Sequence, residues 1–117
     1  MVPSDLVPLC SDDGQHMIPN LRSDDSFVED FGWHEASGRY AAFLAAHEGQ
    51  KVLFWELGVG GNTPGIIKYP FWRMTAQNIN ATYACLNLGD AEAPEEIVDR
   101  SICIDSDIGK ALKELRR

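Results

Sequence analysis

The sequence predicts an α/β fold: part of a parallel sheet with about three strands, flanking helices and an irregular amino-terminal lead-in. An apolar run at 52–57 leads directly into a glycine-rich turn, Gly58 to Gly65. Two more apolar runs follow, at 82–87 and 100–105, and helical patterns lie before, between and after the runs. Strands with so few polar residues are typical of parallel sheets, which are buried on both faces.

Residues 1–32 contain prolines and acidic clusters but no helical or strand periodicity, which indicates the irregular lead-in. From Trp33 apolar residues recur at helical spacing and stop before Gly49, so we expect an amphipathic helix at 33–48. The first buried strand is expected at 51–57.

A loop is expected at 58–69 and a short helix at 70–78, because the fixed φ of Pro70 suits the first position of a helix. The second strand is expected at 82–87, and a connection rich in small and acidic residues follows at 88–94.

The third strand is expected at 100–105, and a helix begins at Asp107, where apolar residues repeat every three to four positions. Asp105 or Ser106 would cap this helix. Natural sheets usually have about five or six strands, so three parallel strands would leave long apolar edges open. We therefore expect further polypeptide to complete the sheet.

Composition limits the classes of function. The 117 residues suffice for one compact domain, and the net charge of −8 disfavours nucleic acid and anionic membranes as partners. No stretch approaches the length of a membrane span and no signal peptide is recognisable, so a cytoplasmic location is expected. Three cysteines, two of them in predicted buried strands, do not predict a disulfide framework.

The glycine turn is the first candidate ligand site. Gly58, Gly60 and Gly61 would let a ligand approach the backbone, and Asn62 and Thr63 offer short polar groups. The spacing departs from the dinucleotide fingerprint, and no triphosphate-loop motif follows. A flexible strand-to-helix connection is the alternative interpretation.

Asn87 is the second candidate, because a polar side chain at the end of an apolar strand lies on the same sheet edge as the glycine turn. Its amide could bond a ribose hydroxyl. The alternative is an ordinary turn asparagine that bonds its own backbone.

Other chemistry-bearing residues form weaker patterns. Cys10 and His16 supply at most two of the four ligands that zinc needs, so unpaired loop residues are the alternative. The acidic residues of the lead-in resemble a solvated surface and give no acid–base pair. No serine or cysteine lies in a nucleophile-elbow pattern.

Several longer segments of the chain form a recognisable pattern. The longest is Gly58 to Trp72, which reads GVGGNTPGIIKYPFW. The others are Leu9-Cys10-x-x-Asp13-Gly14, Asn20-Leu21-Arg22-x-Asp24-Asp25-x-Phe27-Val28, Gly32-Trp33-His34 and Arg39-Tyr40. Together these segments resemble the carboxyl-terminal half of sirtuins, above all the microbial macrodomain-linked sirtuins that ADP-ribosylate proteins.

This resemblance implies a Rossmann-like sheet that holds the adenosine side of NAD, as a weak half-site. It assigns contacts with the adenosine, its ribose or the adenine ring to positions in the glycine turn, at the end of the second strand and at the start of the last helix. These positions are Gly58, Val59, Gly60, Asn62, Thr63, Asn87, Asp107 and Ile108.

The chain also departs from the family. It lacks the first glycine-rich NAD turn, the Gln-Asn-x-Asp segment and the catalytic histidine. Sirtuins hold zinc with two cysteine pairs, and here Cys10 would be joined by Asp13 instead of a second cysteine. Bound zinc is therefore not expected. Residues 1–32 would be a remnant of the zinc module, and 33–117 half of the NAD-binding domain.

Two functional hypotheses follow. In the first, the chain is a truncated sirtuin-family protein, related to NAD-dependent deacylases and ADP-ribosyltransferases and inactive alone. In the second, it is an interaction module that completes its sheet with a separately encoded amino-terminal half or with a second copy of itself.

Overall fold

The computed structural model describes residues 3–22 and 25–116. The chain divides into two units, residues 1–40 and 41–117, with the boundary inside helix α1 (Phe31–Ala46).

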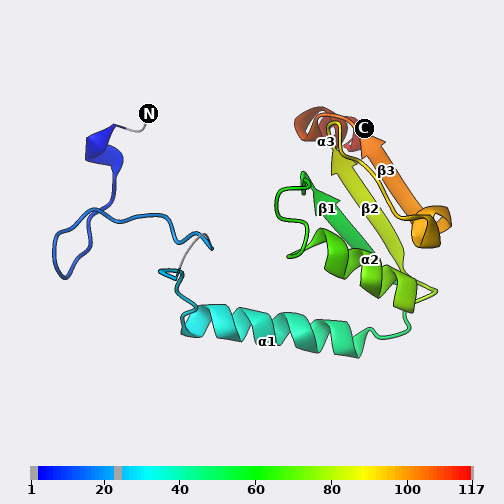
Figure 1. The fold of residues 1–117 in the computed structure, drawn as a ribbon, viewed down its shortest axis with the longest axis horizontal. Helices are drawn as coiled ribbons and strands as arrows, with labels where there is room; N and C mark the ends of the chain where they lie inside the picture. The colour runs from blue at the N-terminus through cyan, green and yellow to red at the C-terminus, as the bar shows by residue number, and fades with distance from the viewer. Residues whose placement is uncertain (1–2, 23–24, 117) are drawn as a thin grey trace. The chain divides into compact units, whose positions relative to one another are not determined.

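The carboxyl-terminal unit is built on a parallel sheet (Figure 1). Within the described residues its strands are β1 (Leu53–Leu57), β2 (Thr82–Asn87) and β3 (Ser101–Asp105), in the order β1-β2-β3. Both pairings are parallel, and Glu56 lies opposite Cys85, which in turn lies opposite Cys103. The predicted α/β class with three parallel strands and flanking helices is confirmed.

Two helices follow the strands at slightly different places from those predicted. Helix α2 (Lys68–Gln77) begins two residues before Pro70, so the proline occupies its third position. Helix α3 (Ile108–Leu115) is capped by Asp107, whose Oδ1 accepts a hydrogen bond from the Lys110 N–H at 2.9 Å. The predicted caps, Asp105 and Ser106, are therefore wrong.

The connection from β2 to β3 holds an element that periodicity did not indicate, the 3₁₀-helix η2 (Glu95–Arg100). Because η2 includes Arg100, β3 begins at Ser101, one residue after the predicted start. The Arg100 Nη1 donates to the carbonyl oxygens of Thr75 and Asn78 at 2.8 and 2.9 Å, and so secures the end of α2.

One face of the sheet carries the core. Side chains that alternate along β1 and β2 share this face, and Ile97 of η2 packs into the same cluster, with Phe71 and Trp72 of α2 against it. The buried members of the cluster are Phe54, Ala81, Tyr83, Cys85 and Ile97.

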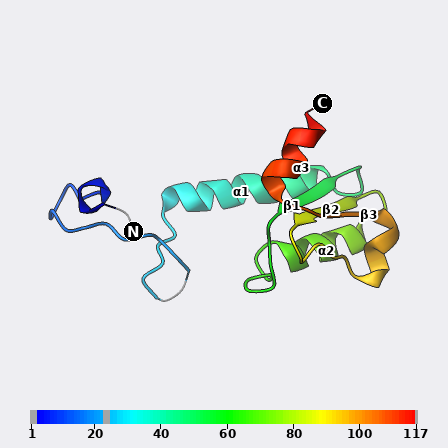
Figure 2. The ribbon, with the colours of Figure 1, turned by 90° about the horizontal axis from the view of Figure 1, so that it is seen from above.

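The opposite face is largely bare, which corrects the prediction of strands buried on both sides. Helix α3 lies on this face, across the sheet from α2 (Figure 2), and Leu86 and Ala111 are buried. The rest of the face is open: its large apolar side chains are 37–56% exposed. They are Leu53, Trp55, Leu57, Ile102 and Ile104. Cys103, on the core face, is also exposed rather than buried, because β3 is an edge strand.

The amino-terminal unit has little regular structure before α1. A 3₁₀-turn, η1 (Ser4–Leu6), precedes an antiparallel bridge between Leu9 and His16. The Asn20 side chain bonds both the N–H and the carbonyl of Val28, each at 2.9 Å, as a neighbouring strand would. The irregular lead-in is therefore held by specific side chains.

Helix α1 begins at Phe31, two residues before the predicted start, and Asp30 Oδ1 accepts the Trp33 N–H at 2.7 Å in the manner of an N-cap. None of its residues is buried. No helix in the described ranges is long and apolar enough to cross a bilayer.

Candidate functional site

Gly58 begins the turn at the carboxyl edge of the sheet. Its N–H donates to the Leu86 carbonyl at 2.9 Å, which extends the β1-β2 ladder by one step. Its φ is +69°, and a Cβ there would lie 3.1 Å from Ile108 Cδ1. A side chain would thus be disfavoured both by the backbone angle and by the start of α3.

Asn87, at the end of β2, is joined to this turn. Its Nδ2 donates to the Val59 carbonyl at 3.1 Å, across 28 positions of sequence. The amide therefore bonds the glycine turn rather than its own backbone neighbours. The structure brings together two features that the sequence had identified separately, although their role in binding NAD stays a prediction.

The junction of β3 and α3 completes the same edge. Asp105 Oδ1 accepts the Gly89 N–H at 2.7 Å and so fixes the turn after β2. Asp107 caps α3. The next residue, Ile108, lies beside Gly58, so this predicted residue adjoins the glycine turn.

The remaining predicted residues lie farther along the turn. A Cβ on Gly60 would lie 3.5 Å from Asp90 Oδ2. Asn62 and Thr63 are exposed. An edge that presents carboxylates and an amide suits the hydroxyl groups of a ribose, because carboxylates accept bonds from hydroxyls and repel phosphate.

A buried charged cluster lies between β1, α2 and β2, and sequence reasoning missed it. Lys68 Nζ and Glu56 Oε1 form an ion pair at 2.7 Å, with side chains 2% and 0% exposed. The Cys85 Sγ donates to the same Glu56 oxygen at 3.1 Å and lies 3.8 Å from Lys68 Nζ. The sequence feature that could have indicated this cluster is Glu56, a glutamate inside an otherwise apolar strand.

The pKa values of three groups in this cluster, Cys85, Lys68 and Tyr83, are raised. Burial raises the pKa of the Cys85 thiol, and the hydrogen bond to Glu56 adds to the effect. Burial opposes the charge of Lys68, but the bond to Glu56 and nearby negative charge outweigh it and raise the Lys68 pKa. Burial also raises the pKa of Tyr83. All three groups are therefore held in their protonated forms.

Three buried polar atoms adjoin this cluster without a hydrogen bond of ordinary geometry: Glu56 Oε2, Trp72 Nε1 and Tyr83 Oη. Buried polar atoms without partners are uncommon in folded proteins. The Lys68 ammonium lies 5.5 Å from the centre of the Trp72 ring, within the range of a cation–π interaction.

Cys10 lies in a tight turn of the amino-terminal unit. Its carbonyl accepts the Gly14 N–H at 3.0 Å, and its N–H donates to the Gln15 carbonyl at 2.8 Å. The Gln15 N–H, and then the Cys10 side chain, lower the pKa of Asp13. Among the described residues, no group of three or more potential ligands gathers here or elsewhere to hold a metal. Asp24 lies outside the described residues.

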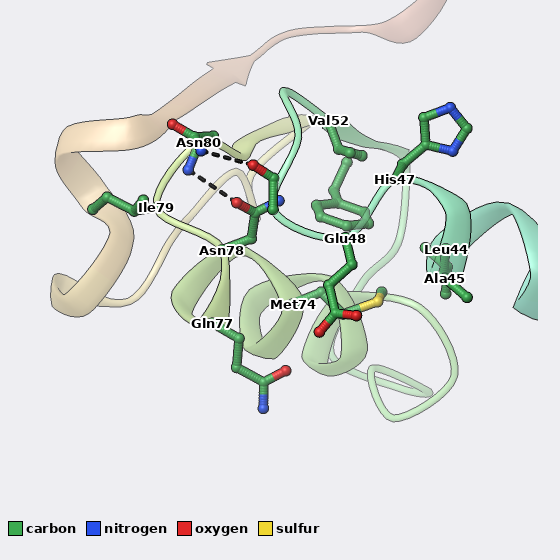
Figure 3. A pocket seen from close by; sticks show the side chains of 12 residues that line it. Leu44, Ala45, His47, Glu48, Val52, Met74, Gln77, Asn78, Ile79 and Asn80 are labelled. Carbon is green, nitrogen blue, oxygen red and sulfur yellow. Dashed lines mark hydrogen bonds between the residues drawn. The ribbon is translucent and has the colours of Figure 1, made fainter.

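A cavity of about 490 Å³ opens at the other, amino-terminal edge of the sheet (Figure 3). Apolar side chains from α1, β1 and α2 line it, and Asn78 and Asn80 close one end by bonding the carbonyls of Gln50 and Gly49. The ring of His47, in the turn after α1, bonds the Phe43 carbonyl of that helix at 2.7 Å. The described residues that line it include none of the predicted site residues.

Comparison with known proteins relates the chain to a longer curated protein. No protein-family model matches the sequence. A curated protein of Staphylococcus aureus strain Mu50, named protein ADP-ribosyltransferase, is 38% identical over 109 residues. The chain is a distant relative of that protein. The match covers 92% of this chain and 35% of the relative, so the chain spans about a third of the relative's length.

Proposed function

We propose that this chain supplies the adenosine side of an NAD site in a sirtuin-like protein ADP-ribosyltransferase or deacylase. The observation that carries the proposal is the bond from Asn87 to the Val59 carbonyl, which joins the end of β2 to the glycine turn at one edge of a parallel sheet. Ligands of open α/β sheets bind outside the carboxyl ends of the strands, which is this edge.

The chemistry of the edge supports the adenosine half rather than the pyrophosphate. Asp90 and Asp105 lie beside the turns and favour hydroxyl groups over phosphate oxygens. The relation to a protein named ADP-ribosyltransferase supports NAD as the ligand, because ADP-ribose is the part of NAD that such a name implies is transferred. Contacts with the pyrophosphate and nicotinamide would come from residues outside these 117.

The same proposal gives each part of the chain a role. Residues 33–117 would be the carboxyl-terminal half of the NAD-binding domain, and residues 1–32 would derive from a zinc module of which Cys10 is the remaining cysteine ligand. Without the first NAD turn and the catalytic histidine, the chain alone would bind NAD weakly and would not cleave it.

Ligand-detected saturation-transfer NMR with NAD tests the proposal. We expect a dissociation constant of about 1 mM or weaker, since few contacts remain to offset the entropic cost of association. Asn87→Ala should abolish the signal. Asn80→Ala is the matched control, because Asn80 makes the same kind of bond, to the Gly49 carbonyl at 2.8 Å, at the opposite edge. Equal signals from both variants would contradict the proposal.

The bare sheet face supports a second function, that of an interaction module. Five large apolar side chains, on β1 and β3, are open on a face that parallel sheets normally cover with helices. Full burial of one such side chain contributes about 1.5–3 kcal/mol. We therefore propose that this face is covered by polypeptide that corresponds to the part of the longer relative outside the matched segment. The alternative occupant is a second copy of the chain.

Co-expression with the part of the Staphylococcus relative that lies outside the matched segment tests this function. We expect a stable complex that Trp55→Ser with Ile102→Ser disrupts. Ile79→Ser is the control, because Ile79 is 75% exposed but lies outside the face. A chain that stays monomeric and ignores the added segment would exclude the interaction module.

A further inference from the structure

The glycine turn belongs to a longer loop, residues 58–67, and both ends of this loop meet a buried charge. Glu56 lies two residues before the loop, in β1, and Lys68 comes directly after it, at the start of α2. Their ion pair of 2.7 Å therefore joins the two ends of the loop within the core.

Local preferences do not explain either residue. A glutamate that points into an apolar core is strongly destabilising if it is left unpaired. A lysine in the first turn of a helix opposes the helix dipole. Moreover, α2 has no acidic residue in its first turn, and Ile67 at its N-cap provides no side-chain bond. Both residues are thus unfavourable separately and compatible only as a pair.

A gain in folding stability also does not explain why this ion pair is present. Replacing a buried ion pair with packed apolar side chains is often neutral or stabilising. Residues that violate such local preferences without a gain in stability are expected at functional sites. The pair lies where it would limit the freedom of a loop, and ordering a loop before it binds a ligand improves affinity.

We propose that Glu56 and Lys68 are positioning residues: their buried ion pair is a clasp that closes loop 58–67 and presents Gly58, Val59 and Gly60 to the ligand. The Cys85 thiol, bonded to the same Glu56 oxygen at 3.1 Å, ties the clasp to β2 and so to the strand that ends in Asn87. The role of the clasp in ligand binding rests on the proposed NAD site. Its effect on the order of the loop does not depend on that site.

Hydrogen exchange of the 117-residue protein, measured by mass spectrometry, tests the clasp. Four variants are compared: Glu56→Gln, Lys68→Met, the apolar pair Glu56→Leu with Lys68→Met, and the charge-swapped pair Glu56→Lys with Lys68→Glu. The readout is the two bonded amides at the ends of the loop, where the Gly58 N–H donates to the Leu86 carbonyl and the Tyr69 N–H to the Pro64 carbonyl. In the apolar pair we expect these amides to exchange about tenfold faster or more, while β2 keeps its protection. The charge-swapped pair should restore slow exchange in the loop.

Glu29→Gln is the matched control, because it removes a carboxylate from an exposed pair with Arg22, also at 2.7 Å. It should leave the loop unchanged. Loop exchange at the wild-type rate in a folded apolar pair would overturn the clasp. So would loss of protection in β2 and the loop together in all four variants, because the pair would then be only structural.

NAD titration of the same proteins separates this inference from the proposed function. If the loop opens as expected but the wild type shows no NAD signal, the proposed function fails and the clasp stands. If the wild type and the apolar pair bind NAD equally and their loops exchange equally, the clasp fails and the proposed function stands.

Discussion

The side chain of Asn87 donates a hydrogen bond to the carbonyl of Val59 at 3.1 Å, so the end of the central strand is fastened to the glycine turn of its neighbour. The bond has a structural effect whatever the ligand, because it restricts the turn that follows β1. It also places an amide where open α/β sheets bind nucleotides. The following predictions test the geometry around this bond.

Gly58 should not tolerate a side chain. Gly58→Ala adds a Cβ at a φ of +69° and 3.1 Å from Ile108 Cδ1. We expect a loss of about 1–2 kcal/mol in the free energy of unfolding, measured by urea denaturation. Gly61→Ala is the control, because nothing lies within 4 Å of its added Cβ and its φ is not positive. Equal stability of the two variants would refute the close packing of Ile108.

Breaking the buried ion pair should cost far more than breaking the exposed one. Lys68→Met leaves Glu56 uncompensated in the core, and we expect a loss of about 3–5 kcal/mol. Glu29→Gln should cost about 0–1 kcal/mol, because solvent screens its pair with Arg22. Denaturant melts of both variants make the comparison. A cost for Lys68→Met no larger than that for Glu29→Gln would mean that Glu56 and Lys68 are solvated.

Stability should fall at alkaline pH. The pKa values of Cys85, Tyr83 and Lys68 are raised above their ordinary values of 9.0, 10.0 and 10.5. Above about pH 9 the unfolded chain therefore releases protons that the folded chain keeps, so the free energy of unfolding falls as pH rises. Each group contributes at most about 1.4 kcal/mol per pH unit.

Denaturant melts between about pH 8 and pH 11 measure this profile. Tyr83→Phe should make the decline shallower above about pH 10, since it removes one of the three groups. It should cost little stability at neutral pH, because the Tyr83 hydroxyl is buried without a bond of ordinary geometry. A profile that stays flat to about pH 11 would mean that these groups are not buried.

The bare sheet face should make the isolated chain associate. Sedimentation velocity over a concentration series should show the wild type self-associating as concentration rises, because Trp55 and Ile102 are 45% and 54% exposed beside other apolar side chains. Trp55→Ser should shift the protein towards monomer. A wild type that stays monomeric and melts cooperatively at high concentration would argue against any occupant of this face.

The sequence predicted the sheet because its signals are local. Residues 82–87 are apolar and bounded by polar turns, and β2 has those bounds. The start of α3 near Asp107 is also a local signal, although Asp107 rather than Asp105 or Ser106 makes the cap bond. The edge shared by Gly58 and Asn87 follows from parallel strand direction alone.

Burial and pairing could not be predicted in the same way. An apolar run such as 52–57 does not indicate how many neighbours its residues have, so the bare face of Trp55 was missed. The Glu56–Lys68 pair depends on where α2 crosses the sheet, which spacing does not specify. The 3₁₀-helix η2 is too short for a periodic pattern to indicate it.

The most direct test of the central claim is an amide chemical-shift map of the chain titrated with NAD. We predict weak, unsaturated shifts confined to the carboxyl edge of the sheet, at Gly58, Val59, Gly60, Asn87 and Ile108, with the amides of Gly49 and Asn80 unmoved. Shifts that gather instead around the cavity at the amino-terminal edge, or no shifts at all at high NAD concentration, would contradict the claim.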